Sequence, residues 1–238
     1  MQAKGKQNQS HLYIKTNILQ RHLYLIGVMF YFTAKYLSNF VTTKNKFIYK
    51  MIQQFFQNFN LFSKNEIEHL LTLFSEIKLS KNVFFVKEGE KCKEIAFIQS
   101  GIFRSFYTSD EGKDNTYCFR FPNDLMASYS SFISDKPSIE NMQAISDATL
   151  LVIKKEKIQE LASENPKWSE FLRMIAEQEY LELEKRFFQL QRDSAAQRYD
   201  FLIENQPNYI QQIPLQHLAS YLGITQRHLS RIRKEISF

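Results

Sequence analysis

Cysteine is almost absent from the sequence, which has 238 residues and only two cysteines, Cys92 and Cys118. Two thiols cannot build the disulfide framework on which many small secreted proteins rely. They also cannot supply the four ligands of a usual iron–sulfur cluster. We therefore expect two structural thiols in a protein of the reducing cytoplasm.

Acidic residues are missing from residues 1–50, which hold eight of the 31 Lys and Arg residues and no Asp or Glu. Residues 51–238 hold the other 23 basic residues and all 25 acidic ones. The net charge of +6 therefore arises in the first segment. The basic excess of the whole chain does not by itself predict nucleic-acid binding.

A long hydrophobic run is also missing from residues 1–50. The apolar run Leu23–Phe32 is about half the length of a membrane span, which needs roughly 20 residues. No small-residue cleavage site follows it, as a signal peptide would require. We favour Met51 as the natural start, with residues 1–50 as an extension that is not native. The alternatives are a genuine disordered or helical extension and a membrane anchor or signal. We expect no membrane partner.

Short apolar runs broken by turn residues fill residues 79–153. The runs comprise residues 83–86, 95–99, 103–108, 117–121, 142–145 and 149–153. Strands of about 4 to 6 residues, with a turn roughly every 8 to 12 residues, are typical of an antiparallel barrel or sandwich. The sequence Asp110-Glu111-Gly112 is typical of a hairpin turn. Residues 51–78 instead read as helices, with Ser63 and Glu66 placed as a capping box.

Histidine is scarce as well. The five histidines are His11, His22, His69, His217 and His228. None lies in the predicted strands, so no barrel histidine is available to ligate haem. The cluster of histidines and carboxylates that a barrel metalloenzyme needs is missing for the same reason. The sequence therefore predicts no metal site, no cofactor and no enzymatic activity.

A long helix without Pro or Gly is predicted from Trp168 to Leu190, after a short helix from Lys155 to Ala162. Its apolar stripe comprises Leu172, Ala176, Leu183 and Leu190 and is interrupted by Glu179 and Arg186. One interpretation is a helix that packs on its own barrel. The other, which we favour, is a dimer helix, because about 35 Å of helix with apolar residues on more than one face needs more than one partner.

The C-terminal segment has the pattern of two short helices joined by a tight turn. The inner face comprises Leu215, Leu218, Ala219, Leu222, Leu229 and Ile232. Gly223 fits a turn that needs a positive φ, and Thr225 can cap the second helix. Ala219 is small where the two helices would cross, so the helices can approach closely. The pattern predicts a helix-turn-helix.

The outer face of the second helix is basic and polar. It comprises Thr225, Gln226, Arg227, His228, Ser230, Arg231, Arg233 and Lys234. A helix that is apolar behind and basic in front fits the major groove of DNA, where Arg can bind guanine and Gln adenine. We expect Thr225 and Lys234, nearer the edge, to contact phosphates. The plainer interpretation is an ordinary helical hairpin with a solvated basic face.

Residues 51–238 resemble the Crp/Fnr family of transcription regulators. The resemblance rests on the sequences LASYLGIT at 218–225, LSRIR at 229–233, AAQRY at 195–199, KEGE at 87–90 and IAFIQSG at 95–101. It implies an α+β chain with three parts. These are an antiparallel β-barrel/jelly-roll of the cyclic-nucleotide-binding type at residues 51–163, a long dimerisation helix at 164–193, and a helix-turn-helix domain at 194–238.

The resemblance also places the family's phosphate cassette at residues 121–144. Members that bind cyclic AMP have Gly-Glu-Leu for the ribose, and Arg followed by Ser or Thr for the cyclic phosphate. Here Ala127-Ser128-Tyr129 and Ser138-Ile139 stand in those places, and Lys136 is the nearby basic residue. Because an anionic phosphate needs a fixed cation, we do not expect cyclic AMP as the effector.

Polar and aromatic residues of this region form the candidate effector pocket. It comprises Tyr117, Phe119, Ser128, Tyr129, Ser130 and Ser138. The pocket either binds a small ligand or is packed shut, and the sequence leaves both interpretations open.

The predicted function is a sequence-specific DNA-binding transcription regulator of the Crp/Fnr type, not dependent on cyclic AMP. The expected protein is a cytoplasmic homodimer whose partners are double-stranded DNA, RNA polymerase and an unidentified small-molecule effector. The alternative is an effector-binding sensor module that acts through protein contacts rather than DNA.

Overall fold

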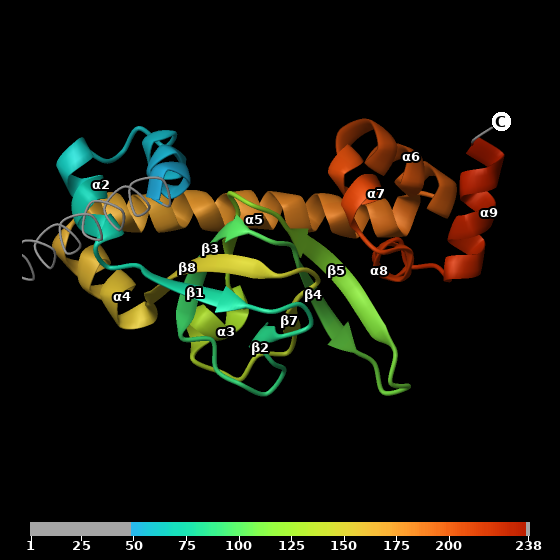
Figure 1. Cartoon of the computed structure of the whole chain (residues 1–238), viewed down its shortest axis with the longest axis horizontal. Coiled ribbons are helices and arrows are strands. Elements are labelled where there is room, and N and C mark those ends of the chain that lie inside the picture. Colours follow the sequence, from blue (N-terminus) through green and yellow to red (C-terminus); the bar gives the residue numbers. More distant parts are fainter. Residues whose placement is uncertain (1–48, 237–238) are drawn as a thin grey trace, which may run out of the picture. The chain divides into compact units, whose positions relative to one another are not determined.

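The computed structural model describes residues 49–236 (Figure 1). The chain divides into two compact units, Met1–Lys50 and Met51–Phe238. The interpretations of the N-terminal extension, including its apolar run, therefore fall on residues outside the described part. The second unit holds the sheets and the helices from α2 onward.

Two four-stranded antiparallel sheets form the centre of this unit (Figure 1). The strands are β1 (Ser75–Leu79), β2 (Phe84–Val86), β3 (Glu94–Ser100), β4 (Phe103–Thr108), β5 (Asp114–Arg120), β6 (Leu125–Met126), β7 (Asn141–Ala144) and β8 (Ala148–Lys154). The first sheet has the order β1-β8-β3-β6 and the second has the order β2-β7-β4-β5. This arrangement confirms the predicted antiparallel jelly-roll-like fold.

The central strands of the first sheet are buried on both faces. Residues 95–98 of β3 and residues 150–153 of β8 are all buried, without the alternation of a half-exposed strand. Phe97 of β3 meets the ring of Phe55, which belongs to the helical residues 49–57, at 5.5 Å between ring centroids. Helices therefore cover the outer face of this sheet, which explains its nearly continuous apolar runs.

Two glycines with positive φ shape the connections of β4. Gly101 has φ +92°, and a Cβ there would lie 2.5 Å from the Cβ of Ala148, so no other residue fits without a shift. Gly112 has φ +75° in the turn between β4 and β5. The backbone N–H of Ser109 donates to the Lys113 carbonyl across that turn at 2.9 Å. The predicted hairpin is confirmed.

The sequence-based prediction of helix up to residue 78 is wrong at its C-terminal end. The helix α2 (Lys64–Leu71) begins at the predicted capping box, where Glu66 N–H donates to Ser63 Oγ at 3.3 Å. It ends at Leu71, and β1 follows, paired with β8 from Ser75 opposite Val152 to Leu79 opposite Ala148. Pairing with a strand that is distant in sequence overrides the local helical pattern. The two-residue β6 was too short to predict.

Two further helices follow the sheets. The helix α4 (Lys155–Glu164) matches the predicted short helix, and α5 (Pro166–Arg192) fills nearly all of the segment predicted as the dimerisation helix. At the start of α5, Trp168 and Phe171 are buried in an aromatic cluster with Phe56 and Phe62. The first half of α5 therefore packs on its own chain.

The second half of α5 exposes large apolar side chains. They are Tyr180, Leu181, Leu183, Phe187, Phe188 and Leu190, each at least 41% exposed. Along the helix, residues 180, 183, 187 and 190 follow one another at spacings of three and four and so share one face. In the described part of the chain, no helix is both long and apolar enough to cross a membrane.

Four helices complete the described chain: α6 (Ala195–Asn205), α7 (Pro207–Gln212), α8 (Leu215–Tyr221) and α9 (Gln226–Ile236). Their shared core includes Tyr199, Leu202, Ile213, Leu218, Ala219, Leu222, Leu229 and Ile232. Ser194 caps α6 in a second capping box with Gln197. The helix-turn-helix prediction thus falls on α8 and α9.

Candidate nucleic-acid interface

The turn between α8 and α9 has the predicted geometry. Gly223 has φ +69°, a conformation that side chains with a Cβ rarely adopt. Its N–H donates to the Ser220 carbonyl, and the next N–H, of Ile224, donates to the Ala219 carbonyl, both at 3.0 Å. Ala219 is only 1% exposed, so its small side chain lies in the helical core.

The start and the buried face of α9 determine which side chains point outward. Thr225 caps the helix, since His228 N–H donates to Thr225 Oγ1 at 3.2 Å. Leu229 and Ile232 are 0% and 3% exposed. With this inner face fixed in the core, the remaining residues of α9 point outward or to the sides.

The predicted DNA-binding residues lie outside this buried face. The exposed members are Thr225, Gln226, Arg227, His228, Arg231, Arg233 and Lys234. Ser230 is half-buried, and its hydroxyl donates to the Gln226 carbonyl at 2.9 Å. Four basic residues and one acidic residue give α9 a formal charge of +3. The structure thus leaves seven of the eight predicted residues accessible to a partner.

A contact between α8 and the second sheet was missed by sequence reasoning. Arg104 on β4 is 6% exposed, and its guanidinium approaches His217 Nδ1 on α8 at 3.1 Å. The same guanidinium donates to the Asp114 carboxylate at 2.8 Å and to Gln143. These partners come from distant parts of the sequence, so no local pattern could reveal them.

A second polar contact joins α8 to β5. The N–H of Thr116 donates to Ser220 Oγ at 2.9 Å, and Ser220 Oγ donates to the Asp114 carbonyl at 2.8 Å. The hydroxyl therefore bridges a backbone donor and a backbone acceptor of one strand. Together with the Arg104 contact, it holds the first helix of the helix-turn-helix against the barrel.

The environment of His217 keeps its imidazole neutral. Burial, and after it the positive charge of Arg104, lowers the pKa of His217 from 6.5 to about 4. The neutral ring can accept a hydrogen bond from the Arg104 guanidinium at Nδ1, whereas an imidazolium would be repelled. The contact between α8 and the barrel is therefore compatible with neutral pH.

Three of the predicted effector residues meet inside the barrel, around a carboxyl group that the prediction missed. Ser128 Oγ and Ser138 Oγ are 2.9 Å apart and both residues are buried. The hydroxyl of Tyr117 donates a short hydrogen bond to Glu140, which is 8% exposed. Ser138 Oγ also lies 2.8 Å from the Glu140 carbonyl. The polar groups of this cluster are thus bonded to one another.

Burial raises the pKa of the Glu140 carboxyl, while hydrogen bonds from Tyr117 and Ser128 act in the opposite direction. Burial likewise raises the pKa of Tyr117. Lys136, the basic residue near Ser138 in sequence, is exposed. The place where the resemblance implies an arginine for a cyclic phosphate is occupied by Ser138, next to the buried carboxyl group of Glu140.

The other predicted effector residues lie elsewhere. Phe119 packs against the C-terminal helices, with its ring 5.3 Å from Tyr209 and 5.4 Å from Tyr221. Ser130 is exposed on α3 (Tyr129–Ser134). The structure does not bring these two residues together with Ser128 and Ser138, because adjacent chain positions and neighbouring strands face different parts of the molecule.

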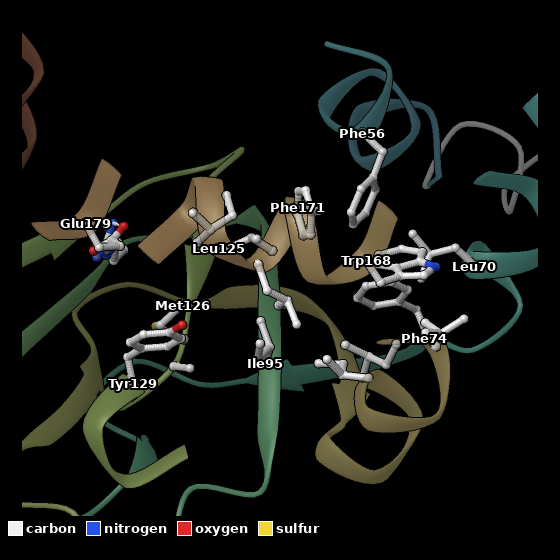
Figure 2. A pocket seen from close by; sticks show the side chains of 17 residues that line it. Phe56, Leu70, Phe74, Ile95, Leu125, Met126, Tyr129, Trp168, Phe171 and Glu179 are labelled. Atoms are coloured by element: carbon white, nitrogen blue, oxygen red, sulfur yellow. Dashed lines mark hydrogen bonds and ion pairs between the residues drawn. The ribbon is translucent and has the colours of Figure 1, made fainter. Parts of the chain in front are cut away.

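Tyr129 lines a separate apolar pocket between the first sheet and α5 (Figure 2). Figure 2 shows Tyr129 and Glu179 at one end and Trp168 with Phe74 at the other. Glu179 pairs with Arg120 of β5, with one N–O distance of 2.9 Å. The cavity measures about 70 Å³, whereas about 150 Å³ holds benzene in another protein. It is too small for a ligand of that size.

The thiols and metal-binding groups add no second site. Cys92 and Cys118 are free, their thiols lie near backbone carbonyls, and burial raises the pKa of each. Within residues 49–236, no three His, Cys, Asp or Glu residues gather as a metal site would require.

Comparison with known proteins agrees with this architecture. The model of the cyclic nucleotide-binding domain family matches residues 76–165. The "Anaerobic regulatory protein" of Bacillus subtilis (strain 168) is 25% identical over 106 residues, which cover 44% of this chain and 44% of that protein. The match thus spans less than half of the curated relative.

Two solved structures share the fold over most of their length. FixK2 from Bradyrhizobium japonicum has 19% identity and a TM-score of 0.62, covering 69% of this chain and 84% of that one. A Crp/Fnr-family transcriptional regulator from Eubacterium rectale has 16% identity and a TM-score of 0.62, covering 77% and 88%. The chain thus contains a match to the cyclic nucleotide-binding domain and has the fold of FixK2 and of the Crp/Fnr-family regulator from Eubacterium rectale.

Proposed function

We propose that this protein is a homodimeric, sequence-specific DNA-binding transcription regulator. The observation that carries the proposal is the surface of α9. Its inner residues Leu229 and Ile232 are buried against the neighbouring helices, and its outer face is accessible with a formal charge of +3. A positively charged helix whose inner face is packed on neighbouring helices fits the major groove of DNA.

Each part of this surface has a proposed role. Arg227 and Arg231 project from successive turns and would bind guanine O6 and N7, while Gln226 would bind adenine. His228, Ser230 and Arg233 complete the surface. Thr225 and Lys234, at the two ends, would contact phosphates and fix the register.

The exposed apolar stripe on α5 supports the homodimer. Tyr180, Leu183, Phe187 and Leu190 lie on one face and are 43–62% exposed. Burying such side chains against a second copy would stabilise the pair by the hydrophobic effect. Two copies would place two α9 helices in successive major grooves about one helical turn apart.

A charge placed in this stripe tests the dimer. We expect Phe187→Glu to weaken dimerisation by about 100-fold, because it buries an unpaired carboxylate. The matched control is Ile203→Glu, which adds the same charge at an exposed apolar position on α6 that is 40% exposed. Sedimentation equilibrium measures both. Equal dimer affinity of the two variants would contradict the role of the stripe.

We also propose that the regulator does not depend on cyclic AMP. A cyclic phosphate placed near Ser138 would meet the buried Glu140 carboxyl, and Ser138 itself stands where the resemblance implies an arginine. Transfer of the phosphate from water to that site would lack the charge partner that its burial requires. The regulator would act in the cytoplasm, and contact with RNA polymerase stays a prediction.

In vitro selection of duplex DNA by the full chain tests the DNA-binding proposal. We expect enrichment of a palindromic site to the same extent with and without cyclic AMP. The control variant changes both Arg227 and Arg231 to Gln and should enrich no site. Enrichment only with cyclic AMP would contradict independence from that nucleotide. No enrichment by the unchanged chain would favour a sensor module that acts through protein contacts.

A further inference from the structure

Two arginines from other helices bind the carbonyls at the end of α8. The helix ends at Tyr221 with Leu222 as its cap, so these last carbonyls lie beyond the hydrogen-bond ladder of the helix. Arg186 of α5 donates to the Tyr221 carbonyl, and Arg198 of α6 donates to the Leu222 carbonyl at 2.9 Å. Each guanidinium is thus the partner of a group that an isolated helix would leave to water.

Further contacts fix both guanidiniums. The guanidinium of Arg186 stacks on the Tyr221 ring, with Cζ 3.7 Å from the ring centroid. Arg198 also donates to the carbonyl of Asp193, the C-cap residue of α5. The first arginine therefore joins α5 directly to the end of α8, and the second joins the end of α5 to the end of α8 through α6.

These contacts are made without an acidic partner. Among residues 49–236, no carboxylate forms an ion pair with Arg186 or Arg198. Burial lowers the pKa of Arg186, and the positive charge of Arg198 acts in the same direction. Apolar side chains of similar size would join the helices without the cost of burying two cations. What the guanidiniums add is direction, because a hydrogen bond to a carbonyl fixes an orientation and an apolar contact does not.

The two carbonyls stand directly before the turn from which α9 starts. Gly223 follows Leu222, and a Cβ at Gly223 would lie 3.8 Å from Leu190 Cδ2 and 4.0 Å from Arg198 Nη2. The turn therefore lies beside the end of α5. Leu190 also belongs to the exposed apolar stripe that supports the homodimer. The helix that would join two copies thus contacts the turn that sets the direction of α9.

We propose that Arg186 and Arg198 are positioning residues that fix α9 relative to α5 and thereby set the half-site spacing that the dimer accepts. This inference rests on the proposed function, because it requires two copies that read a palindrome. With both carbonyls bound, the two α9 helices of a dimer keep one separation and one relative orientation. One added base pair moves the half-sites apart by about 3.4 Å and turns one against the other by about 35°, which a rigid pair cannot follow.

Fluorescence anisotropy on palindromes of different spacing tests this role. The duplexes are the palindrome selected by the unchanged chain and two derivatives, with one base pair added to its centre or removed from it. The unchanged chain should bind the derivatives at least about tenfold more weakly than the selected palindrome.

The variants are Arg186→Met and Arg198→Met, which keep an unbranched side chain but remove the donors. Each should bind the selected palindrome about tenfold more weakly, because α9 is no longer preorganised for both half-sites. Each should also distinguish the spacings by less than about threefold, since a loosened α9 can follow a shifted half-site.

Arg192→Met is the matched control. Arg192 also lies on α5 and is exposed, and its guanidinium lies over the Phe188 ring rather than on α8. This variant removes the same charge and should keep the spacing preference. Urea unfolding followed by circular dichroism checks that each variant folds. If Arg186→Met does not fold, Arg186→Lys takes its place with the same expected direction, because lysine keeps the charge but not the planar stack.

A palindrome with one base changed in each half-site separates positioning from damage to α9. Discrimination against that base should persist in Arg186→Met and Arg198→Met, because α9 keeps its own side chains. Loss of both base discrimination and spacing preference would mean that the arginines only support the fold of α9, and would overturn the positioning role.

The remaining outcomes separate this inference from the proposed function. An unchanged spacing preference in both arginine variants, or an unchanged chain that binds every spacing equally, would overturn the inference and leave the DNA-binding function standing. An unchanged chain that binds no duplex would overturn the proposed function, and the inference with it.

Discussion

The outer face of α9 and the serine cluster of the barrel were both predicted as binding sites, and they differ in almost every physical property. On α9 the predicted residues are exposed and basic. In the barrel, Ser128 and Ser138 are bonded to each other beside the buried Glu140, and Tyr117 donates to that carboxyl. One surface is available for a polyanion, whereas the other has satisfied its polar groups internally.

The difference shows which kind of site a sequence can specify. Along a helix, the buried residues Leu229 and Ile232 fix the orientation of all the others, so the outward face follows from spacing alone. In the barrel, the partners of Ser128 come from elsewhere in the chain, and the decisive residue, Glu140, belongs to no predicted strand. A polar cluster of this kind depends on contacts that local patterns do not encode.

The largest effect is expected when a buried side chain on the inner face of α9 is truncated. Leu229 of α9 is fully buried in the core of the C-terminal helices, so Leu229→Ala should destabilise these helices by about 2–5 kcal/mol and abolish DNA binding. Urea unfolding followed by circular dichroism measures this loss. The matched control is Ile203→Ala, at a position that is 40% exposed. A loss no greater than that of the control would break the argument that the outer face depends on this core.

A smaller effect is expected at the carboxyl group of the barrel. The raised pKa of Glu140 means that the folded state holds its proton more tightly than the unfolded chain. Its contribution to stability is therefore greatest at low pH and is lost as the pH rises above 4.5 and through the raised folded pKa. Glu140→Gln keeps a hydrogen-bond acceptor for Tyr117 but carries no charge. We therefore expect this variant to raise the free energy of unfolding by about 1 kcal/mol near pH ~8.

Denaturant unfolding at several pH values measures this difference. The gain from Glu140→Gln over the unchanged chain should shrink as the pH falls toward 4.5. Glu76→Gln, on the exposed side of β1, is the control and should show no such trend. A gain in stability that is constant across pH would mean that the folded protein does not disfavour the ionised form of the Glu140 carboxyl.

Some of the fold and of the α9 surface could be predicted because short patterns determine them. The strand β4 and the turn at Gly112 follow from alternating runs and turn residues, and the cap at Thr225 follows from its place before an apolar stripe. The strand β1 could not be predicted, because its local pattern is helical and only its pairing with β8 makes it a strand. The contact between Arg104 and His217 joins positions 113 residues apart.

The smallest effect is expected at the contact between the two regions. The pKa of His217 is lowered from 6.5 to about 4, so between these values the unfolded chain binds a proton that the docked ring does not. Docking of α8 should therefore be fully stable above pH 6.5 and weaken as the pH falls toward 4. We expect a modest change, below about tenfold, because the ring is only half-buried.

Hydrogen exchange at the Thr116 amide reports this docking, because its N–H donates to Ser220 Oγ. Protection, corrected for the intrinsic rate, should fall over that pH range in the unchanged chain. It should persist in His217→Gln, whose side chain can still accept from Arg104 but does not titrate. His69→Gln, on α2, serves as the control and should behave like the unchanged chain. The same pH profile in all three would show that His217 does not control the contact.

The most direct test of the account measures whether Arg231 reads a base. Fluorescence anisotropy at fixed salt would compare the unchanged chain, Arg231→Ala and the control Lys78→Ala, which removes one positive charge from the exposed edge of β1. The duplexes are the selected palindrome and its single-base variants. We predict that Arg231→Ala loses about 1–3 kcal/mol of discrimination at one base pair of each half-site, while Lys78→Ala keeps it. Unchanged affinity and unchanged base preference in Arg231→Ala would contradict the assignment of α9 as the DNA-reading helix.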